Sequence, residues 1–334
     1  MNALSFPVLS CALLAACFFS RVAYANECAA TRMSHALSER IVAAAMNEYA
    51  TFNGHRIDAA GRLWKFGSTE TESEPLLDPA TGRPYKDVSH HVVWRRVWEY
   101  WLVLDQHVPG IALSRKVVTF PDALDSGPGH GVAKEQSLRE LFAEWDREPS
   151  AFRESLRQAA LRAALNDSPW SAAFISYVMH QSGLDDGQFR YAAAHWQYVK
   201  AAFSGDRQYA YRACDPRHTQ PRQGDLLCYS RGALAPEDFA AWRSGISRPG
   251  FSAASHCEIV VMVDRTASKM ETVGGNVLQS VTRRKLKLNQ EGYLSSGHYP
   301  TEATKSVPPE CARDRSCVQP NLNIQQWSVL LQLR

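Results

Sequence analysis

The 334-residue sequence lacks the features that mark several classes of protein. Its longest clear apolar run, at residues 8–19, is shorter than the roughly 20 residues that a membrane-spanning helix needs. It has no block of Lys and Arg like a DNA-binding arm, and its net charge is only +3, so nucleic acid is not expected as a partner. No HExxH motif or zinc-finger spacing of cysteines occurs, so no metal or other cofactor is expected.

Internal repeats and low-complexity linkers are also missing, and the composition is that of a globular protein, with 45% hydrophobic and 21% charged residues. This length suffices for one large domain or two smaller ones. We divide the chain into a signal peptide at 1–25, a helical, loop-rich N-terminal part at 26–150 and an α+β core at 151–334.

The N-terminus has the pattern of a signal peptide. An apolar stretch precedes Ala23-Tyr24-Ala25, a small-x-small cleavage site, so we expect cleavage before Asn26. Leu14-Ala15-Ala16-Cys17 also resembles a lipobox, and the alternative is a lipoprotein anchored through Cys17. Both alternatives predict export, to the periplasm or beyond the cell, with no transmembrane segment after cleavage.

Export to an oxidising compartment favours disulfides between the cysteines that follow the signal. There are six of them: Cys28, Cys214, Cys228, Cys257, Cys311 and Cys317. Cys214–Cys228 and Cys311–Cys317 are the locally plausible pairs, because their members are close in sequence. The sequence does not determine the pairing, and the other combinations stay open.

The periodicity of apolar residues changes along the chain. It predicts helices at 33–49, 91–103, 133–145, 150–165, 169–183 and 189–203, and strands at 223–229, 257–263, 269–273, 277–288 and 326–333. Residues 50–90 and 105–130 are expected to be loops, the first with one short hairpin. Arg283-Arg284-Lys285-Leu286-Lys287 indicates the solvated face of a strand, or at most a site for an anionic polymer. Helices followed by an antiparallel sheet define an α+β fold.

The predicted helix at 169–183 carries the first candidate for chemistry, Ser171. Asp167 or Ser168 would be its N-cap, with Pro169 at the first helical position. Ser171 then lies in the first turn, where unpaired N–H groups and the helix dipole stabilise a nucleophile or a developing oxyanion. The simpler interpretation is a small first-turn residue.

Two further residues complete a candidate triad with Ser171. His256 stands at the start of a predicted buried strand, and Asn276 follows a glycine pair at the end of the next one. A histidine takes the proton of a nucleophile, and a third polar group orients the imidazole. Glu258 shares the strand face of His256 and is a rival orienting group. The simpler interpretations are a structural histidine and a Gly-Gly-Asn turn.

Four segments carry a resemblance to a known superfamily. Pro169-Trp170-Ser171-Ala172-Ala173-Phe174-Ile175-Ser176 resembles the Pro-Trp-Cys-Ala-Ala-Phe-Val signature of CHAP-type amidases, which are papain-like cell-wall hydrolases. Gly224-Asp225-Leu226, Ser255-His256-Cys257-Glu258-Ile259-Val260-Val261 and Val273-Gly274-Gly275-Asn276 are similar to the later motifs, in the same order. Residues 35–300 as a whole resemble the domain-of-unknown-function family numbered 2272, whose members are exported bacterial proteins.

The resemblance implies a papain-like core, in which a helix packs on an antiparallel sheet beside a cleft. It implies Ser171 as nucleophile in place of the usual Cys, His256 as base and Asn276 as orienting residue. A serine, unlike a thiol, needs the histidine as a true general base during attack. Trp170, His195 and Trp196 are candidates for substrate binding.

These observations lead to one leading hypothesis and one rival. The leading hypothesis is an envelope amidase or peptidase that acts on peptidoglycan peptides or a related amide, with ester hydrolysis as a variant. The rival is a catalytically silent module that binds cell-wall glycopeptide or an envelope protein through the same cleft.

Overall fold

The computed structural model describes residues 28, 34–88, 90–120, 133–232, 234–301 and 321–334. The predicted signal peptide, Cys17 and the predicted Cys311–Cys317 pair lie outside these residues. Within them the chain has an α+β fold, with most helices before residue 205 and most of the large sheet after residue 210. No helix among the described residues is long and apolar enough to cross a membrane.

The large sheet has eight strands in the order β2-β1-β9-β8-β7-β6-β10-β5. Their bounds are β1 His55–Ile57, β2 Leu63–Lys65, β5 Tyr211–Cys214, β6 Leu226–Ser230, β7 Ser255–Asp264, β8 Lys269–Val277, β9 Ser280–Lys287 and β10 Gln326–Leu333. Neighbours are antiparallel except β1 and β9, which are parallel. The short β1 and β2 thereby join an N-terminal segment to the C-terminal half of the sheet.

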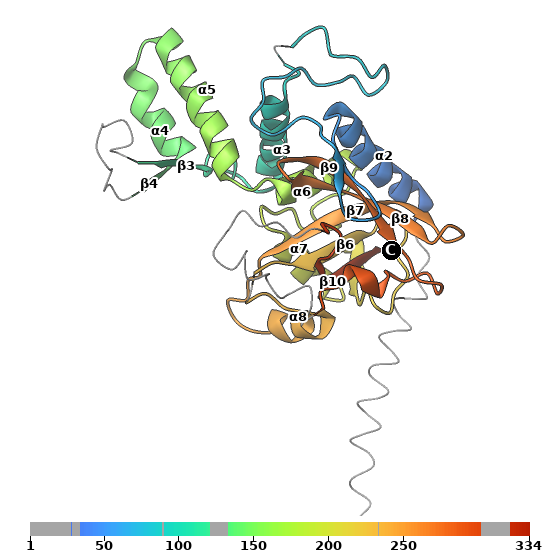
Figure 1. The fold of residues 1–334 in the computed structure, drawn as a ribbon. Helices are drawn as coiled ribbons and strands as arrows, with labels where there is room; N and C mark the ends of the chain where they lie inside the picture. Colours follow the sequence, from blue (N-terminus) through green and yellow to red (C-terminus); the bar gives the residue numbers. More distant parts are fainter. Residues whose placement is uncertain (1–27, 29–33, 89, 121–132, 233, 302–320) are drawn as a thin grey trace, which may run out of the picture.

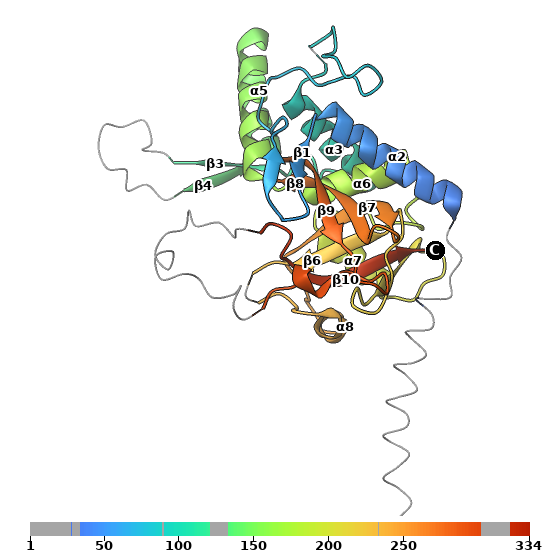
Figure 2. The same ribbon diagram turned by 45° about the vertical axis from the view of Figure 1, so that its right-hand side comes forward.

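The helices lie on one side of this sheet and beyond its edge (Figure 1). Their bounds are α2 His35–Thr51, α3 Val93–His107, α4 Leu138–Glu144, α5 Ser150–Asp167, α6 Ser171–Gln181, α7 His195–Ala202 and α8 Phe239–Ile246. Helix α6 packs on β7 and β8, and α2 and α3 pack against α6. The α4–α5 pair and the two-stranded sheet of β3 (Lys116–Thr119) and β4 (Lys134–Ser137) project from one end of the molecule, where α5 contacts α3 (Figures 1 and 2).

Two hydrophobic cores form on the two sides of the sheet, because successive strand residues point to opposite faces. Cys257 and Ile259 of β7 join Phe174 of α6 in the first cluster, which we call the helical-side core. Val260 of β7 belongs to the other cluster, with Tyr229 and Leu286, which we call the second core. Because side chains alternate along β7, successive residues pack into different cores.

The sequence did not predict β3, β5 or α8, and three of the predicted helices have different bounds. Residues 134–137 form strand β4, so the helix predicted from 133 begins only at Leu138, where Ser137 and Glu140 form a capping box. The helix predicted at 189–203 is limited to His195–Ala202. Helix α6 begins at Ser171, two residues later than predicted.

The disulfides differ from the local pairing that the sequence favoured. Cys214 bonds Cys28, 186 residues away, and Cys228 bonds Cys257, its direct cross-strand neighbour. The predicted Cys214–Cys228 pair is therefore wrong. Sequence proximity misled because β10 lies between the strands that carry Cys214 and Cys228. The two disulfides are typical of a protein that folds in an oxidising compartment.

Candidate functional site

Ser171 is the first residue of α6 and follows a proline-imposed break between two helices. Pro169 disfavours helical backbone at the preceding residue, and Ser168 is extended, with φ −116° and ψ 112°, at the end of α5. The N-cap of α6 is Trp170, and no side chain caps the helix. The predicted cap at Asp167 or Ser168 is therefore wrong; the Asp167 carboxylate accepts the backbone N–H of Val118 instead.

Packing holds the N-terminus of α6 rigidly. Trp170 is fully buried, and its indole N–H donates to the buried Glu70. One turn later Phe174 lies directly against Gly275 of β8, where a Cβ atom would come within 2.4 Å of the Phe174 ring. The missing side chain at Gly275 lets α6 approach the sheet closely. Trp170, a predicted substrate-binding residue, is thus enclosed in the core and positions its neighbour Ser171.

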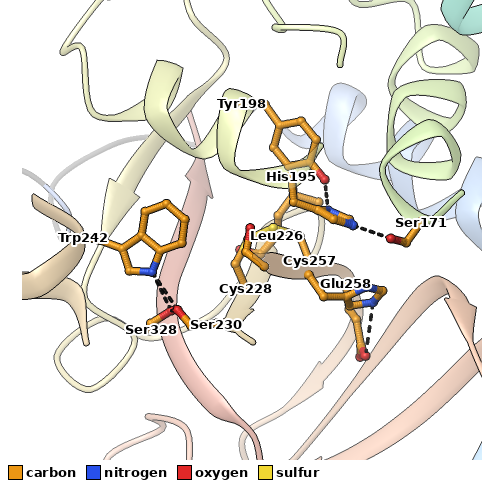
Figure 3. The surroundings of a disulfide bond; sticks show 12 residues. Ser171, His195, Tyr198, Leu226, Cys228, Ser230, Trp242, Cys257, Glu258 and Ser328 are labelled. Atoms are coloured by element: carbon orange, nitrogen blue, oxygen red, sulfur yellow. Dashed lines mark hydrogen bonds and ion pairs between the residues drawn. A yellow bond between two sulfur atoms is a disulfide. The ribbon is translucent and has the colours of Figure 1, made fainter. Parts of the chain in front are cut away.

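The side chain that meets Ser171 is His195, the first residue of α7. The Ser171 Oγ and His195 Nε2 atoms are 2.7 Å apart, and the Tyr198 hydroxyl hydrogen-bonds the other ring nitrogen, Nδ1. Figure 3 shows the three side chains in a line from α6 to α7. When His195 Nδ1 carries the proton and donates to Tyr198, Nε2 is free to accept the Ser171 O–H.

Burial sets the charge of this histidine. Desolvation, with a smaller contribution from Arg231, lowers the pKa of His195 from 6.5 to about 3. Burial also raises the pKa of Tyr198 well above 10. At neutral pH the site therefore consists of a neutral imidazole between two neutral hydroxyls, which is the protonation state that a general base requires.

His256, the predicted base, is close to this group but does not contact Ser171 through a hydrogen bond. Its ring centroid is 4.9 Å from that of His195. The side chain is fully buried, and neither ring nitrogen has a hydrogen-bond partner among the described residues. Burial, followed by the nearby His195, holds its pKa well below 6.5. His195 thus occupies the place next to Ser171 that the sequence assigned to His256.

The alternation of β7 explains this exchange. His256 is paired with Tyr229 and lies on the same strand face as Glu258 and Val260, the face of the second core. Helix α6 packs on the other face, with Cys257. The motif spacing shows that His256 begins a strand. The face of the sheet on which its side chain lies depends on the strand register.

The two predicted orienting residues have other surroundings. Glu258 pairs with Arg284, with 2.9 Å between Oε1 and the guanidinium, and accepts the Thr272 hydroxyl. Its Oε1 is 3.8 Å from His256 Nε2, beyond hydrogen-bond distance. Asn276 lies at a bulge in β8 with φ 54°, and no hydrogen bond joins it to His256 in the described part of the chain.

The remaining predicted substrate-binding residue, Trp196, follows His195 in α7. It is half-buried, and its indole meets the Phe251 ring edge-on, with 6.4 Å between centroids. The sequence suggested His195 only for substrate binding and gave no sign of a role for Tyr198. A readable signal exists, because residues three apart on a helix share a face, so His195 and Tyr198 form a neighbouring pair once α7 is predicted.

The arrangement has the parts that nucleophilic chemistry requires. The first backbone N–H groups of α6, from Ser171 onward, have no partners within the helix and point toward its N-terminal end, where they stabilise negative charge. A nucleophile, a base and N–H donors are the parts of a hydrolase of the serine type. Among the described residues, no cluster of His, Cys, Asp and Glu could hold a metal ion.

Comparison with known proteins places the chain in a family without assigning it an activity. No curated protein and no solved structure matches it. Residues 142–333 match a bacterial family described as uncharacterized protein conserved in bacteria (DUF2272). This match spans the site and more than half of the chain, so the protein belongs to the DUF2272 family.

Proposed function

We propose that the protein is an exported envelope amidase or peptidase, with Ser171 as nucleophile and His195 as general base. The observation that carries this proposal is the 2.7 Å contact between Ser171 Oγ and His195 Nε2 at the start of α6. The proposed substrate is an amide bond in peptidoglycan peptides or a related molecule, in the periplasm or outside the cell. The motifs similar to CHAP-type amidases support this choice.

The proposed reaction has two stages. Ser171 Oγ attacks the carbonyl carbon, its proton moves to His195 Nε2, and the carbonyl electrons move to the oxygen, which the free N–H groups of α6 would stabilise. Collapse of this intermediate breaks the C–N bond, and His195 gives the proton to the departing amine. Water, activated by His195, then hydrolyses the acyl ester. Tyr198 is a positioning residue that keeps the His195 ring in place.

The neutral resting state of His195 suits a serine nucleophile at this position, where the similar CHAP-type motif has cysteine. A thiolate mechanism needs a protonated imidazole next to the sulfur, and burial disfavours that charge at His195. Serine instead remains protonated until attack, with a neutral imidazole as base. The resting site therefore suits a serine better than a thiolate–imidazolium pair, and the imidazolium that forms during attack carries the same cost of burial.

The test combines purified mature protein with peptidoglycan sacculi and identifies released muropeptides by mass spectrometry. We expect wild type to release fragments, and Ser171→Ala and His195→Gln to lower the rate by at least about a thousandfold. His256→Gln is the matched control, because it changes a second buried histidine whose ring nitrogens form no hydrogen bond with Ser171. Loss of activity in His256→Gln with retention in His195→Gln would restore the base assignment that the sequence suggested.

A second candidate function is binding without catalysis, and the enclosure of the site favours it. Ser171 is 8% exposed, His195 4% and His256 0%, so a substrate needs a rearrangement to reach the hydroxyl. The binding hypothesis predicts no fragments from wild type or Ser171→Ala, while both proteins sediment with sacculi.

A further inference from the structure

A second surface of the molecule has a chemistry that hydrolysis at Ser171 does not use. Six basic side chains lie on one face of β2, β1, β9 and β8: Arg56, Lys65, Lys269, Arg283, Lys285 and Lys287. We call this the cationic face. Lys269 and Lys287 are exposed, and the other four are half-buried. It lies beside α2, whose Tyr49 ring is within 6 Å of the Lys65 and Arg283 cations.

Strand register brings these cations directly opposite one another. Arg56 pairs with Lys65 on β2 and with Arg283 on β9, and Lys269 pairs with Lys287. Like charges at directly opposed positions destabilise a sheet. Protection of a sheet edge by lysine explains Lys65 on the edge strand β2. It does not explain Arg283, which lies where β9 is paired with β1 on one side and β8 on the other.

The described acidic residues neutralise the face only in part. Glu271 forms an ion pair with Arg283. Asp264, opposite Lys269, accepts the backbone N–H of Ala267 in the β7–β8 turn. None of the described carboxylates forms an ion pair with Lys269, Lys285 or Lys287. The three lysines line a hollow of about 400 Å³ together with Met262, Asp264 and Glu271.

The spacing of the charges indicates the shape of a ligand. Arg283, Lys285 and Lys287 alternate along β9, and residues two apart on a strand are separated by about 7 Å. A linear polymer of polyol phosphate, with a short three-carbon unit between successive phosphates, reaches this spacing when nearly extended. Lysine ammonium groups and arginine forks both bind phosphate oxygens well.

We propose that the cationic face binds a linear polyol-phosphate polymer of the cell envelope, with its phosphates along β9. This surface would hold the protein on the envelope independently of the chemistry at Ser171. Binding to such a polymer releases counterions, so it weakens steeply as salt rises.

The test measures binding of the mature protein to poly(glycerol phosphate) at several salt concentrations, with neutral dextran as the uncharged polymer. Lys285→Gln/Lys287→Gln should weaken binding at least tenfold in low salt and reduce the salt slope by about two. Lys134→Gln/Lys200→Gln removes the same charge away from the face and should bind within twofold of wild type. Circular dichroism and thermal unfolding verify that both double variants are folded.

Three results would overturn the proposal: equal losses in the two double variants, no binding of wild type at 50 mM salt, or tighter binding to a DNA oligonucleotide or to anionic phospholipid vesicles than to the polymer. Ser171→Ala should bind the polymer like wild type. Failure of the hydrolase proposal would therefore leave this result unchanged, and the reverse is also true.

Discussion

The two buried histidines of the site differ in their hydrogen-bond partners, although their ring centroids are only 4.9 Å apart. On the helical side, His195 has a hydroxyl on each ring nitrogen, one from Ser171 and one from Tyr198. His256 points toward the side of Glu258 and Arg284 and has no hydrogen-bond partner in the described residues. Both pKa values are lowered by burial. A shifted pKa therefore does not identify a general base, whereas the hydrogen-bond partners of the imidazole do.

The largest expected effects come from the disulfides, one in each core. Cys28–Cys214 closes a loop of 186 residues in the second core, and Cys228–Cys257 closes one of 29 residues in the helical-side core. Loop entropy gives stabilisations of about 5 and about 4 kcal/mol. Urea unfolding of the two double Cys→Ala variants should show a larger loss for the long loop. A larger loss for Cys228–Cys257 would show that packing outweighs loop entropy here.

Removal of a buried charge should have the next largest effect. Arg284 is fully buried and pairs with Glu258, so Arg284→Met leaves an unpaired carboxylate and should lower the free energy of unfolding by about 4 kcal/mol. The control is Arg62→Met, which breaks an ion pair whose arginine is 73% exposed and should cost less than about 1 kcal/mol. Similar losses in urea unfolding would mean that water reaches Arg284.

Two adjacent glycines of β8 face opposite sides of the sheet, so adding one methyl group at each tests the two sides separately. A Cβ atom at Gly275 would lie 2.4 Å from Phe174 on the helical side, and one at Gly274 would lie 2.8 Å from Glu258. Each change to alanine should cost about 2 kcal/mol through overpacking. Only Gly275→Ala should disturb the Ser171–His195 contact, since it displaces α6. Loss of activity in Gly274→Ala instead would connect the Glu258 side to the reaction.

The smallest effect, per pH unit, concerns titration of His195. Above pH 6.5 the imidazole is neutral in the folded and unfolded states and does not change stability. Between 6.5 and about 3 only the unfolded chain binds the proton, so the free energy of unfolding decreases by about 1.4 kcal/mol for each unit by which the pH is lowered. Asp225, whose pKa burial raises to about 7, acts in the opposite direction.

Chemical unfolding at pH 7 and pH 5 measures this slope. His195→Gln should reduce the acid loss relative to wild type, and Asp225→Asn should increase it. An unchanged slope in His195→Gln would contradict neutral burial of this imidazole.

Local patterns in the sequence were sufficient to predict the bounds of several helices and strands. Alternating and periodic apolar residues predicted the bounds of β10 and placed β6 to β9 within a few residues, and the run from Pro169 placed Ser171 in the first turn of a helix. These features depend on neighbours in the chain, such as proline restriction and strand alternation. The α+β class followed from the same patterns.

The contacts between residues far apart in the sequence became known only from the tertiary structure. Cys214 bonds Cys28 across 186 residues, and His195 rather than His256 reaches Ser171, because strand order and the side on which α6 packs set these contacts. Both depend on the burial of whole faces, to which residues far apart in the sequence contribute together. A sequence motif can therefore identify a histidine and predict its strand. The packing of helices on the sheet determines which imidazole hydrogen-bonds the serine.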